Sequence, residues 1–220
     1  MVDIKSQALK PENLDRLKSE QQLVRAYLTN SGNTARAVKM LEHVVDLRSQ
    51  TLKVEHLDRL RSEHELARAY LESADFDRAV TILEHVCNIY LQTRRVEHPD
   101  RLASEHLLAL AYLDHSGFGD IDRAVKMMEH LVDIRSHTLK AEYLDRLTLE
   151  HVFARAYLES GDTARAIRTL EQVVKTQAQT LQAEHPHRFG SEQLLAKAHL
   201  AMLGTIETSA TTEMSNSNSD

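Results

Sequence analysis

Blocks of leucine, alanine and valine alternate with charged residues along the chain, and the pattern returns about every 42 residues. The triplet Asp-Arg-Leu marks the register. It begins at Asp15, Asp58, Asp100 and Asp145, and a changed copy begins at His187. These positions are 43, 42, 45 and 42 residues apart. A tyrosine follows the same steps, at Tyr27, Tyr70, Tyr112 and Tyr157. The sequence therefore predicts an array of repeated units.

The differences in repeat length are confined to one short segment of each unit. From the arginine of an Arg-Ala pair to the next marker is always 22 residues, whereas from the tyrosine to that arginine is 9, 8, 11 or 8 residues. Serine and glycine gather in this variable segment, as in residues 116–119. A turn tolerates insertion and a packed helix does not, so each unit is predicted to be helix, turn, helix.

The predicted fold class is all-α, a solenoid of helix-turn-helix repeats. First helices are expected at 14–30, 57–73, 100–115 and 144–160, and second helices at 34–52, 76–93, 121–139 and 163–181. Asp, Asn or Thr at the turn exits can cap the second helices. We expect a partial repeat at 1–13, four repeats plus a capping helix (187–203) at 14–203, and a disordered polar tail at 204–220.

The first residues match the end of a second helix, because 2–10 align with 45–53 position by position. Either the chain is a piece of a longer protein or something else covers this end, since repeat arrays need polar caps. The apolar residues Val2, Ile4 and Leu9 predict self-association or the attachment of further repeats.

The pattern Leu66-Ala67-x-x-Tyr70 followed by Ala79-x-x-x-Leu83 resembles the skeleton of tetratricopeptide repeats. In this resemblance Ala67, Ala109 and Ala154 lie where the two helices of a unit meet. The period near 42 resembles the longer, kinesin-light-chain class. The motifs Ala-Arg-Ala-Tyr-Leu and Leu-Glu-His-Val-Val are similar to those of repeats at the C-terminal ends of fungal NOD-like receptors. The resemblance covers residues 2–203 and implies a right-handed α-solenoid.

Composition narrows the class of function. The formal net charge of -6 argues against sequence-independent nucleic-acid binding, which needs a basic surface. The chain has neither an apolar run of membrane-spanning length nor a signal-peptide stretch, so we expect no membrane association and a cytoplasmic location.

Neither metal binding nor catalysis is predicted. The 13 histidines mostly occupy repeated slots, and equivalent residues of stacked helices lie about 8–10 Å or more apart, too far to share a zinc ion. Cys87 follows Val86 within a second helix and is expected to pack as a small apolar residue. We therefore predict no metal, no cofactor and no enzymatic activity.

The resemblance places the binding face on the first helices, which line the concave groove of such arrays. The groove residues that it implies are Arg25, His64, Arg68, Leu71, His106, Leu110, Leu113, His151, Arg155, Leu158 and Lys197. Alternatively, these side chains form a solvated face, because Arg68 and Glu72, like Arg155 and Glu159, have the i, i+4 spacing of helical ion pairs.

Two functions remain open at this point. The first is a scaffold that binds a peptide or protein, with an acidic partner complementary to the basic floor and with NOD-like-receptor ligand sensing as one setting. Histidine protonation would tighten such binding toward pH 6. The alternative is a structural module that self-associates through its open N-terminal half-repeat.

Overall fold

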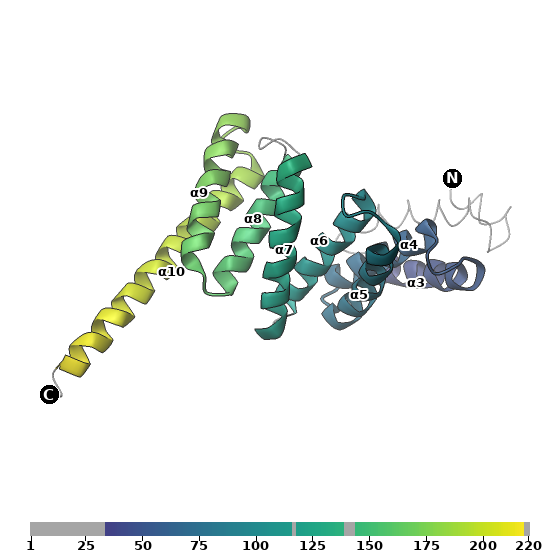
Figure 1. Ribbon diagram of the computed structural model, residues 1–220, viewed down its shortest axis with the longest axis horizontal. Helices are drawn as coiled ribbons and strands as arrows, with labels where there is room; N and C mark the ends of the chain where they lie inside the picture. Colours follow the sequence, from purple (N-terminus) through teal and green to yellow (C-terminus); the bar gives the residue numbers. More distant parts are fainter. Residues whose placement is uncertain (1–33, 116–117, 139–143, 218–220) are drawn as a thin grey trace. The chain divides into compact units, whose positions relative to one another are not determined.

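The computed structural model describes residues 34–115, 118–138 and 144–217, with the side chains of 118–119, 138 and 205–217 left out. Over these ranges the chain is helical without strands, which confirms the all-α, tetratricopeptide-like fold (Figure 1). The chain divides into two compact units, Met1–His115 and Ser116–Asp220. The predicted helix at 14–30 and the half-repeat at 1–13 lie outside the described residues.

The first unit contains α3 (Thr34–Thr51), α4 (Leu57–Glu72), α5 (Phe76–Thr93) and α6 (Pro99–Asp114). The second contains α7 (Phe118–Thr138), α8 (Leu144–Glu159), α9 (Thr163–Thr180) and α10 (Pro186–Ser217). Successive helices pack against each other within each unit. In repeat terms, α4, α6, α8 and α10 are first helices, and α3, α5, α7 and α9 are second helices.

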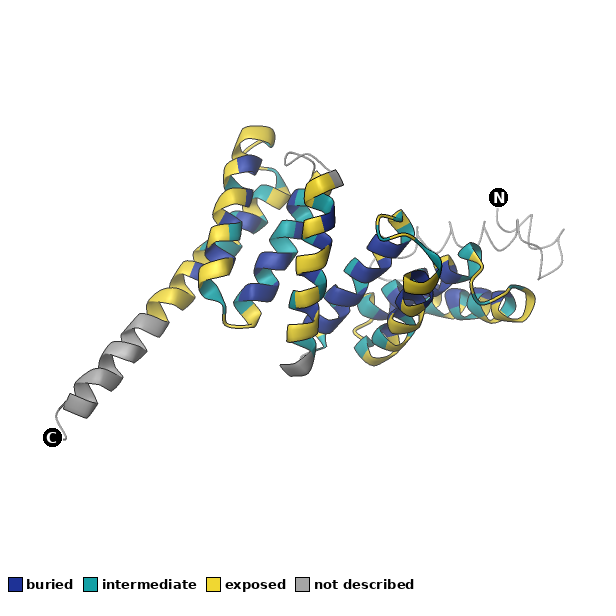
Figure 2. Cartoon of the chain, viewed as in Figure 1, coloured by how far each residue is buried: buried dark blue, intermediate teal, exposed yellow. Residues whose placement is uncertain are grey.

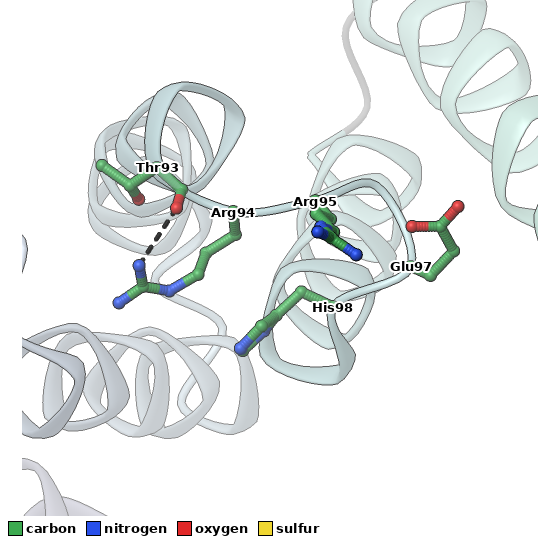
Figure 3. A pocket seen from close by; sticks show the side chains of 5 residues that line it. All are labelled: Thr93, Arg94, Arg95, Glu97 and His98. Atoms are coloured by element: carbon green, nitrogen blue, oxygen red, sulfur yellow. Dashed lines mark hydrogen bonds between the residues drawn. The ribbon is translucent and has the colours of Figure 1, made fainter.

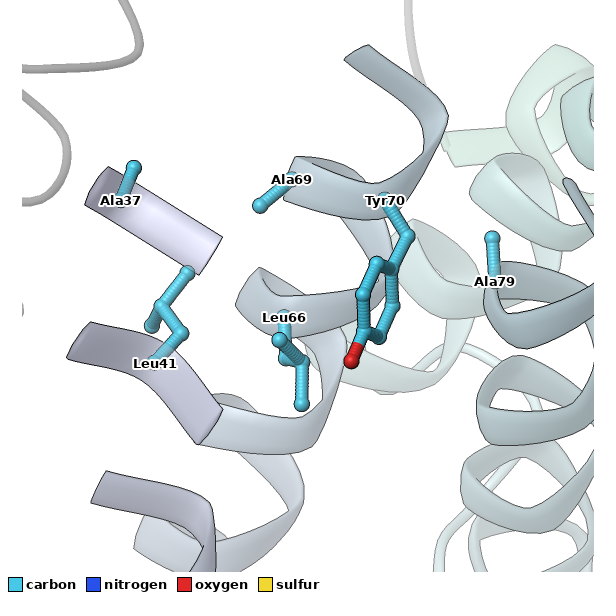
Figure 4. Close-up of a cluster of buried hydrophobic side chains, with 6 residues drawn as sticks. All are labelled: Ala37, Leu41, Leu66, Ala69, Tyr70 and Ala79. Atoms are coloured by element: carbon cyan, nitrogen blue, oxygen red, sulfur yellow. The ribbon is translucent and has the colours of Figure 1, made fainter. Parts of the chain in front are cut away.

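Small and large apolar residues alternate in the core of the first unit. Ala37 and Leu41 of α3 meet Leu66, Ala69 and Tyr70 of α4, and Ala79 of α5 completes the cluster (Figure 4). The second unit repeats this design with Ala154 of α8, Ile167 and Leu170 of α9, and Ala198 of α10. Alanine at the contact allows the helix backbones to approach closely. Ala67, Ala109 and Ala154 are all fully buried, as the repeat pattern predicts.

The turns follow the predicted chemistry. Asp75 and Asp162 cap the second helices α5 and α9 by accepting hydrogen bonds from the backbone N–H groups of Arg78 and Arg165. The residue before each of these aspartates has a left-handed backbone, with φ of 59° at Ala74 and 86° at Gly161.

Two helices are longer than the sequence pattern predicts. The third repeat has three extra residues, and these lengthen α7, which begins at Phe118 and not at Ile121. The insertion therefore adds a helical turn. The helix α10 continues to Ser217, whereas we expected it to end near Leu203 and to be followed by a disordered tail. Residues 204–217 contain four Thr, three Ser and two Glu but no proline, so no residue there forces the helix to stop.

Within the part of the chain that the structure describes, no helix has the length and apolarity needed to cross a membrane.

Candidate functional site

Adjacent first helices of each unit are joined by polar bridges. In the first unit, the guanidinium of Arg61 on α4 donates two hydrogen bonds to Asp100 Oδ2 on α6, at 2.8 and 3.0 Å. One turn further along α4, His64 Nδ1 lies 3.0 Å from Ser104 Oγ. The second unit has the same histidine–serine contact, between His151 Nδ1 on α8 and Ser191 Oγ on α10 at 3.0 Å. These bridges hold neighbouring first helices side by side.

The structure places the predicted groove residues in two groups, one in each unit. His64, Arg68 and Leu71 on α4 are half-buried, as are His106 and Leu110 on α6. Leu113 is only 4% exposed, so the prediction that it offers surface to a ligand is wrong.

In the second unit, His151, Arg155 and Leu158 on α8 are half-buried, and Lys197 on α10 is exposed. Arg25 lies outside the described residues. Because the histidines of both units use Nδ1 to bridge helices, they serve helix packing as well as the surface.

The two arginines of this surface pair differently. Arg155 binds Glu159 at 3.3 Å, the predicted i, i+4 pair. Arg68 instead pairs with Glu65, three residues before it, and not with Glu72. The reason lies in the sequence of the two helices. The position that holds Glu65 in α4 is held in α8 by Val152, which offers no carboxylate.

Burial is the first cause that lowers the pKa of His151, and the charges of Arg155 and His187 lower it further. An imidazole with a lowered pKa stays neutral at a pH where a free histidine is already partly charged. His151 therefore carries less positive charge near pH 6 than a free histidine would, which weakens its predicted role in the histidine row.

The sequence analysis missed the function of the arginine in the Asp-Arg-Leu marker. Each described copy donates through Nε to a glutamate four residues later, at 2.8–2.9 Å, in the pairs Arg59–Glu63, Arg101–Glu105, Arg146–Glu150 and Arg188–Glu192. Arg101 also donates to the carbonyl oxygen of Arg94, just past the end of α5, at 3.1 Å. The marker arginine thus ties one repeat to the end of the previous one. The i, i+4 spacing was visible in every copy of the sequence.

Two of the histidines before the first helices cap them through the side chain, His56 and His185, whereas His98 forms no such bond. His56 Nδ1 accepts a hydrogen bond from the backbone N–H of Asp58 at 3.2 Å, and His185 accepts from His187 at 3.3 Å. The ring of His98 stacks on Tyr90, with centroids 6.2 Å apart. Among the residues with described positions, no three His, Cys, Asp or Glu side chains gather as metal ligands would.

A hollow of ≈ 430 Å³ lies beside the loop between α5 and α6, lined by Thr93, Arg94, Arg95, Glu97 and His98 (Figure 3). One of its arginines, Arg94, donates to the backbone oxygen of Thr93 at 3.0 Å. All of the lining comes from one loop and its flanking residues, so the hollow does not bring distant catalytic groups together.

Comparison with known proteins decides the family. Tetratricopeptide repeat models match residues 15–92 and 153–180. The crystal structure of nearly identical tetratricopeptide-like repeats, from a Podospora anserina protein that carries the name kinesin light chain, is 43% identical over 93% of this chain and 93% of that one, with a TM-score of 0.76. The chain belongs to the tetratricopeptide repeat family.

Two more distant solved structures share the fold alone. BtubC (BKLC) of P. vanneervenii is 12% identical over 91% of this chain and 89% of that one, with a TM-score of 0.58. A double mutant of MamA is 17% identical over 81% and 82% of the two chains, with a TM-score of 0.56. No curated protein matches the chain.

Proposed function

We propose that this tetratricopeptide array is a protein-interaction scaffold that binds a peptide or a partner protein on the surface of its first helices. Support comes from the family, whose repeats serve mainly in protein interactions, and from the surface itself. Each unit combines a partly exposed arginine with one leucine three residues later, Leu71 or Leu158. The proposal rests on this combination, because hydrophobic contact supplies affinity and the cation selects the partner.

The first unit presents Arg68, whose side chain is 37% exposed, with half-buried Leu71 and Leu110 beside it in the repeat register. The second presents Arg155, whose side chain is 33% exposed, with Leu158 and the exposed Lys197. An acidic segment that also carries apolar side chains complements both surfaces. Because Glu65 and Glu159 already pair with the two arginines, a ligand carboxylate must compete with them. We therefore expect charge to affect association rate and selectivity more than affinity.

A fluorescein-labelled peptide library built from Asp, Glu and Leu tests this proposal by fluorescence anisotropy. The variant Arg68→Glu plus Arg155→Glu should bind the selected peptides at least about tenfold more weakly, since like charges then face each other across the contact. Added salt should weaken binding to the parent protein. Because the pKa of His151 is lowered, this residue should tighten binding between pH 7 and pH 6 less than a free histidine would.

A matched control carries the same change in net charge on second helices, at the exposed Lys39 and Arg168. Lys39→Glu plus Arg168→Glu should leave the affinity nearly unchanged. Equal weakening in both double variants would show that only the overall charge matters. Unchanged binding in a folded Arg68→Glu plus Arg155→Glu protein would place the binding site elsewhere.

We also propose, from the sequence motifs of the repeats, that the array is the ligand-sensing part of a NOD-like receptor. The phosphate-binding pattern G-x-x-x-x-G-K-[ST] of such a receptor's nucleotide-binding domain is not found in these 220 residues. Sequencing the full transcript tests the idea. A parent reading frame without a nucleotide-binding domain would rule it out.

A further inference from the structure

The first helix α10 carries a row of exposed apolar side chains. Phe189 is 57% exposed, Leu200 69% and Leu203 57%, and Ala196 between them is also exposed. Their spacings of seven, four and three residues place them on one side of the helix. Figure 2 shows exposed positions along this part of α10. These four residues are called the α10 stripe below.

At the positions equivalent to Phe189 and Ala196, the other described first helices carry buried side chains. Phe189 occupies the slot of Leu60, Leu102 and Leu147, which are 0%, 8% and 1% exposed. Ala196 occupies the slot of Ala67, Ala109 and Ala154, all at 0%. Since the slots are the same, the sequence of α10 does not explain the difference. Those earlier slots are covered by neighbouring helices, and the corresponding cover is absent from α10 within the described residues.

The first unit shows what covers such a slot. Leu60 packs against Val86, Ile89 and Tyr90, all in the C-terminal half of the second helix α5 of its own repeat. At α10 the chain makes no turn at the equivalent place. Residues 202–204, which correspond to the turn residues 73–75, are helical, and α10 continues to Ser217 (Figure 1). The α10 stripe is therefore equivalent to a surface that the last turns of a second helix cover in the first unit.

The chain contains a segment with that sequence. Residues 2–10 align with 45–53, at and just past the end of α3, and in this register Ile4 occupies the slot of Leu47 and of Ile89, one of the side chains that cover Leu60. Val2 occupies the slot of Val45 and Cys87. In the same register the slot of Tyr90 falls on Lys5 and that of Val86 on Met1, so Ile4 is the apolar residue of this segment that matches a side chain covering Leu60.

We propose that the α10 stripe of one molecule binds residues 2–10 of a second molecule, with Ile4 covering Phe189 as Ile89 covers Leu60. The two surfaces differ, so the contact is head-to-tail and can extend to further copies. This assembly involves neither Arg68 nor Arg155 and is independent of the peptide-binding proposal.

Multi-angle light scattering of the full chain across a wide concentration range tests the proposal. The parent should form concentration-dependent oligomers. Phe189→Glu removes the acceptor surface and Ile4→Glu removes the donor, so each variant alone should be monomeric. An equimolar mixture of the two should form heterodimers and nothing larger, because one intact donor then meets one intact acceptor. Leu91→Glu is the matched control, since Leu91 on α5 is 55% exposed and lies outside the stripe, and it should assemble like the parent.

Circular dichroism verifies that every variant is folded. A parent that stays monomeric at the highest concentration overturns the proposal. So does an Ile4→Glu protein that associates like the parent while Phe189→Glu does not, because the helices α10 would then pair with each other. Equal loss of assembly in Leu91→Glu overturns it as well, since any added charge would then suffice.

Discussion

The hydroxyl of Tyr70 on α4 donates a hydrogen bond of 2.6 Å to Glu42 Oε1 on α3, 28 residues earlier. The guanidinium carbon of Arg78 lies 4.4 Å from the centre of the same tyrosine ring. The arrangement recurs in the second unit with Tyr157, Glu129 and Arg165, where the Tyr157–Glu129 bond is 3.1 Å. The repeated tyrosine thus ties its first helix to the second helix of the preceding repeat.

Tyr70→Phe should lower the free energy of unfolding by about 1–2 kcal/mol, because it removes the partly exposed hydrogen bond to Glu42 and the one that Arg78 donates to the same hydroxyl, and keeps the ring. Urea unfolding followed by circular dichroism measures the change. In a double-mutant cycle, Glu42→Gln should cost less in the Tyr70→Phe background than in the parent. Strict additivity of the two changes would show that the hydrogen bond contributes nothing.

The pair Arg101–Glu105 is buried, with side chains 10% and 8% exposed, whereas the equivalent Arg188–Glu192 on α10 is 24% and 42% exposed. Arg101→Met should cost about 3–5 kcal/mol, because it leaves a buried carboxylate without its cation. Arg188→Met should cost no more than about 1 kcal/mol. Parallel urea titrations compare the two. Similar losses would mean that burial does not set the cost.

Ala109 is fully buried where helices meet, so Ala109→Leu should overpack the contact and cost about 1–3 kcal/mol. Ala196 fills the same repeat slot on α10 but is exposed, and Ala196→Leu should leave the stability nearly unchanged. Thermal unfolding of dilute protein separates the two variants. An unchanged melting temperature for Ala109→Leu would contradict the register assigned to the repeat.

Ala74 and Gly161 occupy the same turn position with φ of 59° and 86°. A left-handed backbone disfavours a residue with a Cβ, so Ala74→Gly should stabilise the protein by up to about 1 kcal/mol. Gly161→Ala should destabilise it by a similar amount, although a Cβ at Gly161 would meet nothing within 4 Å. Chemical denaturation of both variants gives the two signs. Matching signs would rule out backbone strain as the cause.

Burial raises the pKa of the Cys87 thiol and of the Tyr90 hydroxyl, each to about 12. The unfolded values are about 8.5 for cysteine and about 10 for tyrosine, so both folded values lie above the unfolded ones. The stability that these neutral groups provide is therefore intact at lower pH and is lost as the pH rises through about 9 to about 12. Tyr90→Phe should lose stability with a shallower slope between about pH 10 and about pH 12. Equal slopes in urea midpoints against pH would contradict this assignment.

Most of the fold was readable from the sequence because equivalent residues recur in every unit. The predicted ends of α5, at Phe76 and Thr93, agree with the structure. The start of α7 at Phe118 was missed because glycine and serine usually mark turns, whereas here part of the Gly-containing insertion was absorbed as helix. The continuation of α10 was missed for a similar reason, because composition ranks Ser and Thr as tail residues although nothing interrupts the helix.

The candidate surface was harder to predict than the fold. Spacing alone paired Arg68 with Glu72, but rotamers allow the arginine to reach back to Glu65. The burial of Leu113 and the lowered pKa of His151 both depend on neighbours in three dimensions, which one repeat's sequence does not specify. The contact between His64 and Ser104 joins residues 40 positions apart, and no local sequence pattern predicts it.

The sequence separation of these hydrogen-bonded pairs also affects how the genes of such arrays can gain or lose repeats. Glu42 to Tyr70 spans 28 residues, and His64 to Ser104 spans 40, so each partner lies no further than the adjacent repeat. Unequal recombination that removes or copies one whole period would give Tyr70 an equivalent glutamate, such as Glu84 or Glu129, whereas the slot of Ser104 holds Leu149 in the next repeat. Because each repeat contacts only its neighbours, the number of repeats in such an array can change while the repeats that remain keep most of their contacts.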